Sequence, residues 1–217
     1  MDIGSLLEHH ARYRPDSLAV VCGAHRATQA QHAADVRRAA HALSALGLRS
    51  GDRLALVMGN RIELLHLYRA AAALGLVTVP LSPLLLEPAL VSLLRDSGSA
   101  AIVADAGSAA LAEAACERVG TIPRARRLVI GGHGTAPEQD WARLVAAAAE
   151  VLPAAAPIDP DQACNLIYSS GTTGMPKGIV LTHRIRALYG LLFAERYGIT
   201  AASCVMHAGS LVFNGAF

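Results

Sequence analysis

The residues best suited to chemistry lie together in the segment SSGTTGMPKG at 169–178. Three glycines, Gly171, Gly174 and Gly178, remove side-chain bulk and let backbone N–H groups converge on an anion. Lys177 adds a positive charge, and hydroxyl donors come from Ser169, Ser170, Thr172 and Thr173. This combination is typical of a loop that binds a polyphosphate.

Apolar runs on both sides predict that this loop joins two strands. Leu166-Ile167-Tyr168 precedes it and Ile179-Val180-Leu181 follows it. The common phosphate loop GxxxxGK[ST] is excluded, because Lys177 stands between Pro176 and Gly178 and no helix is expected directly after it. A solvated polar linker would have the same composition, but the flanking apolar runs disfavour it.

The run YSSGTTGMPKG at 168–178 closely resembles the phosphate-loop signature of the adenylate-forming superfamily. Acyl-CoA synthetases, adenylation domains of non-ribosomal peptide synthetases and luciferases belong to this superfamily. Earlier phrases are similar in order and spacing to the opening of an acyl-CoA synthetase, among them Arg14-Pro15-Asp16, Leu46-Gly47 and GLVTVPLSP at 75–83. One departure is Gln29, where an aromatic residue commonly follows the threonine at the start of the helix.

The alternation of periodic segments predicts an α/β fold with a doubly wound, mostly parallel sheet flanked by helices. The resemblance identifies it as the N-terminal region of an acyl-CoA synthetase-like fold, incomplete relative to the family. We expect an α/β subdomain over 1–152, a proline-rich linker over 153–161, and a unit over 162–217 that holds the phosphate loop, a helix and the start of a second sheet. Helices are predicted over 3–13, 29–46, 62–74, 88–97, 108–118 and 185–197, and strands over 18–22, 53–58, 77–80, 101–104 and 127–130.

Composition limits the partners. The net charge of +2, with acidic and basic residues mixed along the chain, gives no electrostatic reason to expect nucleic acid. The scattered cysteines lack metal-ligand or redox spacing and indicate a reduced, cytoplasmic protein. No signal peptide is expected, and prolines break the apolar stretch at 70–94 into pieces too short to span a bilayer.

By resemblance, the parent enzyme is an acid-thiol ligase that uses ATP, Mg²⁺ and coenzyme A. A carboxylate attacks the α-phosphorus of ATP, giving acyl-AMP and pyrophosphate, and the coenzyme A thiol then displaces AMP. The resemblance implies that Thr172 and Lys177 are catalytic. Thr172 would be the magnesium-side hydroxyl, Lys177 would steady the leaving group, and the remaining cradle would be Ser169, Ser170, Gly171, Thr173, Gly174 and Gly178.

The resemblance also places the start of an acyl pocket near the end of the chain. The family has a histidine there in a PLxH motif, and Phe213 occupies its position, next to Asn214. His207 falls several residues too early and is a weak candidate. Family motifs for adenine, ribose and the second acidic magnesium ligand are absent, and no Asp or Glu lies within 164–184.

Three functions therefore remain open at this point. The favoured one is the N-terminal fragment of a fatty-acid CoA ligase, catalytically incompetent alone. An adenylating enzyme for an aryl or amino acid and a non-catalytic nucleotide-binding module are the alternatives. In each, unpaired sheet edges predict self-association.

Overall fold

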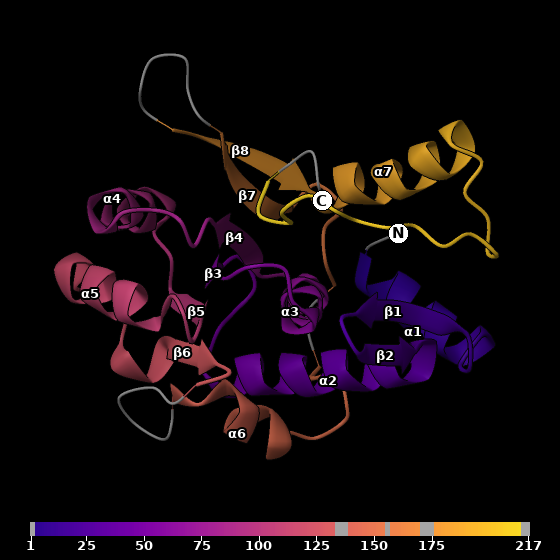
Figure 1. Ribbon diagram of the computed structural model, residues 1–217, viewed down its shortest axis with the longest axis horizontal. Helices are drawn as coiled ribbons and strands as arrows, with labels where there is room; N and C mark the ends of the chain where they lie inside the picture. Colours follow the sequence, from indigo (N-terminus) through magenta and orange to yellow (C-terminus); the bar gives the residue numbers. More distant parts are fainter. Residues whose placement is uncertain (1–2, 133–138, 155–156, 170–175, 214–217) are drawn as a thin grey trace.

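The computed structural model describes residues 3–132, 139–154, 157–169 and 176–213. Its centre is a six-stranded sheet in the order β6-β5-β3-β4-β7-β8 (Figure 1). The first five of these strands run parallel, and β8 pairs antiparallel with β7. The strands are β3 (Arg53–Val57), β4 (Val77–Leu81), β5 (Ala101–Asp105), β6 (Arg127–Ile130), β7 (Ala163–Ser169) and β8 (Lys177–Thr182).

Helices cover both faces of the sheet, which confirms the predicted fold class (Figure 1). One face packs against α2 (Gln29–Ala45) and α3 (Ile62–Ala73), with α1 (Ile3–Tyr13) and the short α6 (Trp141–Ala146) beside them. The other face packs against α4 (Glu87–Ser97) and α5 (Ala109–Val119). The last helix, α7 (His183–Arg196), follows β8 directly.

Alternating side chains of the central strands fill two separate cores. In β3, Leu54 and Leu56 enter the core beneath α2 and α3, whereas Ala55 and Val57 enter the core beneath α4 and α5. A strand that is buried on both faces reads as an unbroken apolar run, because successive side chains point to opposite faces. The run RLALVM at 53–58 therefore predicted β3 correctly.

The helix boundaries follow local chemistry. Thr28 caps α2 through its hydroxyl, which accepts from the Gln31 backbone N–H, and the Gln31 side chain returns the bond to Thr28. Gly47 ends the same helix at φ +73°, where a side chain would be strained. Both signals lie in the sequence, and the helix predicted there is confirmed.

Some elements differ from the predictions. The small hairpin of β1 (Leu18–Cys22) and β2 (His25–Thr28) contains a second strand that was not predicted, and α6 and the 3₁₀ turn Arg124–Arg126 were also missed. Residues 198–213 form no strand, so the second sheet expected toward residue 217 stays a prediction. The predicted division into 1–152 and 162–217 also stays a prediction. Strands from both parts belong to the same six-stranded sheet. Among the described helices, none combines the length and apolar character needed to cross a bilayer.

Candidate nucleotide-binding site

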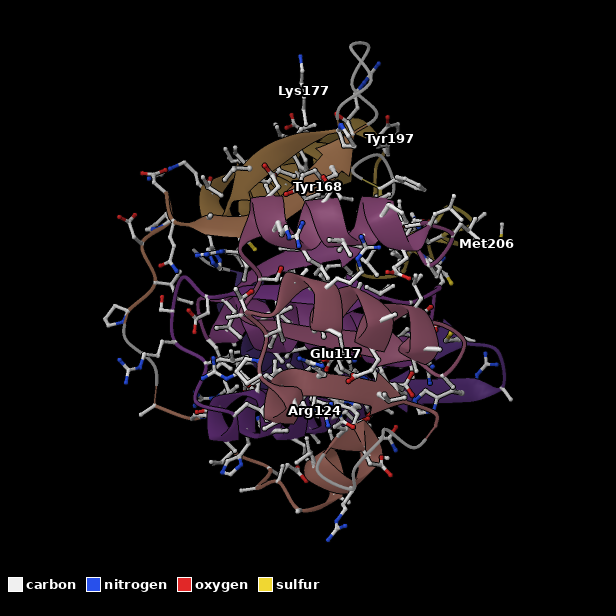
Figure 2. All side chains as sticks on the ribbon, turned by 90° about the vertical axis from the view of Figure 1, so that its left-hand side faces the viewer. Glu117, Arg124, Tyr168, Lys177, Tyr197 and Met206 are labelled. Carbon is white, nitrogen blue, oxygen red and sulfur yellow. The ribbon has the colours of Figure 1, made fainter. Side chains whose placement is uncertain are left out.

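The two strands that flank the proposed phosphate loop form one antiparallel pair. Ser169 ends β7 and faces Lys177, the first residue of β8, across the ladder. Ser169, Lys177 and Gly178 are all exposed, and Figure 2 shows the Lys177 side chain extending outward beyond Tyr168. The structure thus brings together a hydroxyl, an ammonium group and a small residue. The other predicted cradle residues lie outside the described part of the chain: Ser170, Gly171, Thr172, Thr173 and Gly174.

The ring of Tyr168 packs where the β7–β8 strand pair meets the loop. The Tyr168 ring lies over Gly178, where an added Cβ would stand 2.8 Å from Leu166 Cδ1 and 3.4 Å from Tyr168 Cε1. The Tyr168 hydroxyl donates to Asp96 Oδ2 at 2.5 Å, which ties β7 to the end of α4. Burial, followed by the neighbouring Asp96 carboxylate, raises the pKa of Tyr168, so the phenol stays protonated and remains a donor.

A buried polar chain fixes the other end of β7. The Asn165 amide nitrogen donates to Thr78 Oγ1 on β4 at 2.5 Å, and its oxygen accepts from Arg186 Nε on α7 at 2.6 Å. All three side chains are buried. Because an unsatisfied polar group inside a protein is costly, these hydrogen bonds specify how β4, β7 and α7 pack together.

The carboxyl ends of β3, β4 and β7 meet at one edge of the sheet, since these strands are parallel. Ligands of open α/β sheets bind at this edge. Asn60, just beyond β3, holds a distant segment here: its Nδ2 donates to Gly209 O at 2.7 Å, and its Oδ1 accepts from Leu211 N at 2.9 Å. Tyr68 of α3 adds a bond from its hydroxyl to Leu211 O at 2.9 Å. The segment 209–211 is therefore tied to the edge that carries the phosphate-loop strands.

The three acyl-pocket candidates differ in their placement. Phe213 lies two residues beyond this clamped segment, and 55% of its surface is exposed. His207 is exposed and precedes the segment held by Asn60. Asn214 lies outside the described residues.

The residues after β8 have structural partners. Thr182 caps α7 by accepting from the Ile185 N–H. Arg184 forms a two-pronged ion pair with Asp161 at 2.7 and 2.8 Å, and His183 is fully buried. Within the described ranges, no three His, Cys, Asp or Glu side chains form a group able to hold a metal ion.

Sequence reasoning did not identify the residues that support this site. Asn165 was available as a signal, because an amide inside the apolar run CNLIY needs buried partners. Asp96 and Asn60 gave no such signal, because their partners lie far away in the sequence.

The fold and sequence together define a class: an α/β protein with a Ser/Thr/Gly/Lys-rich segment between two strands at the edge of a mostly parallel sheet. The AMP-binding enzyme family matches residues 7–215. The chain belongs to this family, and it corresponds to the N-terminal part of an acyl-CoA synthetase.

Among curated proteins, the chain is 36% identical over 167 residues to long-chain-fatty-acid–CoA ligase FadD13 of Mycobacterium tuberculosis, covering 73% of this chain. It is 34% identical over 182 residues to a feruloyl-CoA synthase of an Amycolatopsis species, covering 83% of this chain. The matches cover 30% and 33% of those relatives, so the chain spans about a third of their length.

Solved structures agree with this placement. The N-terminal domain of FACL13 from M. tuberculosis superposes with a TM-score of 0.73 at 35% identity, over 84% of this chain and 44% of that one. ATP-bound MatB from Rhodopseudomonas palustris superposes with a TM-score of 0.84 at 25% identity, over 100% of this chain and 42% of that one. The similarity therefore extends through the whole described sheet.

Proposed function

We propose that this chain provides the phosphate-binding part of an ATP-dependent acid–CoA ligase. The observation that carries the proposal is the pairing of Ser169 with Lys177 at the carboxyl edge of a parallel sheet, flanking a Ser/Thr/Gly loop. MatB, a protein of similar structure, was solved with ATP bound. The family assignment supports ATP and coenzyme A as substrates of the whole enzyme.

In the proposed reaction, a carboxylate oxygen attacks the α-phosphorus of ATP and pyrophosphate leaves. The coenzyme A thiol then attacks the acyl carbon of acyl-AMP, and AMP leaves. The work assigned to this chain is to hold the β- and γ-phosphates through Lys177, the hydroxyl groups and the loop amides. Hydrogen-bond donors and a positive charge that are already in place around the phosphates lower the activation barrier of this step, because the pyrophosphate leaving group gains negative charge in the transition state.

The proposal includes Mg²⁺, and Thr172 is the residue of this chain whose hydroxyl would contact the ion. A hydroxyl and phosphate oxygens are ligands of the type that Mg²⁺ accepts. When bound with ATP, the ion would neutralise phosphate charge. The stretch 164–184 contains no carboxylate to add to this set.

The acid is proposed to be a fatty acid, with an aryl acid as the second candidate. FadD13 is named for long-chain fatty acids and supports the first. The feruloyl-CoA synthase and a benzoate CoA ligase of Burkholderia xenovorans, 26% identical with a TM-score of 0.82, support the second. Phe213 at the histidine position of the family motif is the proposed pocket residue, with Asn214 and His207 as further candidates.

Calorimetric titration of the 217-residue chain with Mg·ATP tests the phosphate site. We expect Lys177→Ala to weaken binding about ten- to a hundredfold, since charge-assisted hydrogen bonds contribute roughly 1.5–3 kcal/mol. Arg124→Ala is the matched control, because it also removes one exposed positive charge, and Figure 2 shows Arg124 far from Lys177.

Equal weakening by both substitutions would reduce the effect to net charge and contradict a specific role for Lys177. A folded chain that binds no Mg·ATP would contradict the proposal that this chain provides the phosphate-binding part of the enzyme.

A further inference from the structure

The loop end of the β7–β8 pair lies beyond the point where β7 joins the rest of the sheet. The β7 strand pairs with β4 at Asn165 and Thr78, near its own start. Three residues of extended chain place Tyr168 about 10 Å further along. Over this distance β7 pairs with β8, and Figure 1 shows the loop end of the pair extending beyond the other strands. The end that carries Ser169 and Lys177 therefore needs another attachment to keep a fixed position.

Tyr168 provides this attachment. Its hydroxyl donates to Asp96 Oδ2 at 2.5 Å, and its ring packs against the core beneath α4 and α5. In the β7–β8 ladder Tyr168 lies opposite Gly178, and the next pair is Ser169 with Lys177. The bond from Tyr168 thus fixes the place at which both predicted phosphate contacts leave the strand pair.

The acceptor, Asp96, stands on a rigid base. It is the penultimate residue of α4, whose apolar side packs into the core. Arg53 of β3 donates through Nε to Ser97 O at 2.9 Å and through Nη2 to Gly98 O at 3.0 Å. A central strand of the sheet therefore holds the end of α4 in place, and with it the Asp96 carboxylate.

The stability of α4 does not explain a carboxylate at this position. The carbonyl groups at the C-terminal end of a helix carry partial negative charge, so an aspartate in the last turn is unfavourable. A negative charge is also unfavourable beside a strand end that is proposed to bind phosphate. Asp96 is exposed, and within the described ranges its side chain accepts its hydrogen bond from Tyr168. Holding the Tyr168 hydroxyl is therefore the role that this carboxylate can fill.

We propose that Asp96 is a positioning residue for the phosphate site, because by accepting from Tyr168 it fixes the strand ends that carry Ser169 and Lys177. This inference rests on the proposed function. Asp96 acts through Tyr168 and does not touch the nucleotide. Without the bond, the end of the strand pair would adopt several orientations, and Mg·ATP would bind more weakly because it would have to select one of them.

Calorimetric titration of two Asp96 variants of the 217-residue chain with Mg·ATP tests the proposal. Asp96→Asn and Asp96→Leu both remove the negative charge, but only the asparagine keeps an oxygen that accepts from Tyr168. We expect Asp96→Leu to bind about three- to tenfold more weakly than Asp96→Asn, the effect of losing one hydrogen bond. If Asp96 acted through its charge alone, the two variants would bind equally, and both more tightly than wild type.

Tyr168→Phe tests the donor, because it removes the hydroxyl and keeps the ring. It should weaken Mg·ATP binding by a similar factor. When combined with Tyr168→Phe, Asp96→Leu and Asp96→Asn should bind equally, since the bond that distinguishes them is already absent. Tyr13→Phe, at an exposed tyrosine of α1, is the matched control and should bind like wild type.

Equal binding by Asp96→Asn and Asp96→Leu, or unchanged binding in Tyr168→Phe, would overturn the inference while Lys177→Ala still weakens Mg·ATP. A wild-type chain that binds no Mg·ATP would instead contradict the proposed function, and the inference with it.

Discussion

At the residue scale, Gly178 shows how one missing side chain shapes the proposed nucleotide site. An alanine methyl group would stand 2.8 Å from Leu166 Cδ1, which must then shift, and at ordinary contact distance from the Tyr168 ring. Leu166 would have to repack beside a ring that Asp96 holds in place through the Tyr168 hydroxyl. We expect Gly178→Ala to lower the free energy of unfolding by about 1–3 kcal/mol, measured by urea denaturation.

Gly190 provides the matched control for this prediction. It lies within α7, and a Cβ there would meet no atom within 4 Å. Gly190→Ala should therefore stabilise the chain by about 0.5–1 kcal/mol, because alanine favours the helix. If Gly178→Ala were neutral or stabilising like Gly190→Ala, the close approach of Leu166 to position 178 would not matter for stability.

At the element scale, two histidines govern how α2 packs against α3. The rings of His32 on α2 and His66 on α3 lie 5.2 Å apart between centroids, and both side chains are buried. Burial, with His66 and Arg69 nearby, lowers the pKa of His32 from 6.5 to about 4. Burial also lowers the pKa of His66, against the opposing effects of Asp35 and Glu63. Both helices therefore pack around neutral imidazoles.

This arrangement predicts a loss of stability in mild acid. Below pH 6.5 the unfolded chain binds a proton at His32, whereas the folded chain binds it only below about pH 4. Acid therefore favours unfolding between these two values. The difference corresponds to about 3 kcal/mol over that window. Urea denaturation of wild type and His32→Leu at several pH values measures it. The variant should show a flatter profile, and His207→Leu, at an exposed position, should keep the wild-type slope.

Most elements were predictable because their signals are local. Thr28 with Gln31, and Thr182, mark helix starts through bonds to residues within the next turn, and Gly47 marks a helix end through its positive φ. The hairpin strand His25–Thr28 was missed because its sequence, HRAT, is polar and short, and only its pairing with β1 makes it a strand. The short helix α6 depends in a similar way on burial of Trp141.

At the scale of the whole molecule, long-range contacts are what the sequence conceals. The loop could be proposed from 169–178 because its chemistry lies in one continuous segment, and its role in phosphate binding stays a prediction. The residues that support the loop do not lie in one continuous segment. Asn60 binds two residues that are 149 and 151 positions away in the sequence, and Tyr168 binds Asp96. Such partners depend on strand order, which brings β7 beside β4 across a long connection.

The strand order also leaves β8 at the edge of the sheet, paired only with β7 among the described strands. Val180 on this edge is 56% exposed, and α7 beside it exposes Leu191, Leu192 and Phe193. An unpaired edge with apolar side chains favours pairing with another chain.

We expect the 217-residue chain to associate as its concentration rises, measured by sedimentation velocity. Val180→Lys should shift the population toward monomer because charge on an edge strand opposes pairing. Val151→Lys, at a residue 59% exposed in a loop, should leave association unchanged. A chain that stays monomeric at every concentration would contradict the role of this edge, as would equal effects of the two substitutions.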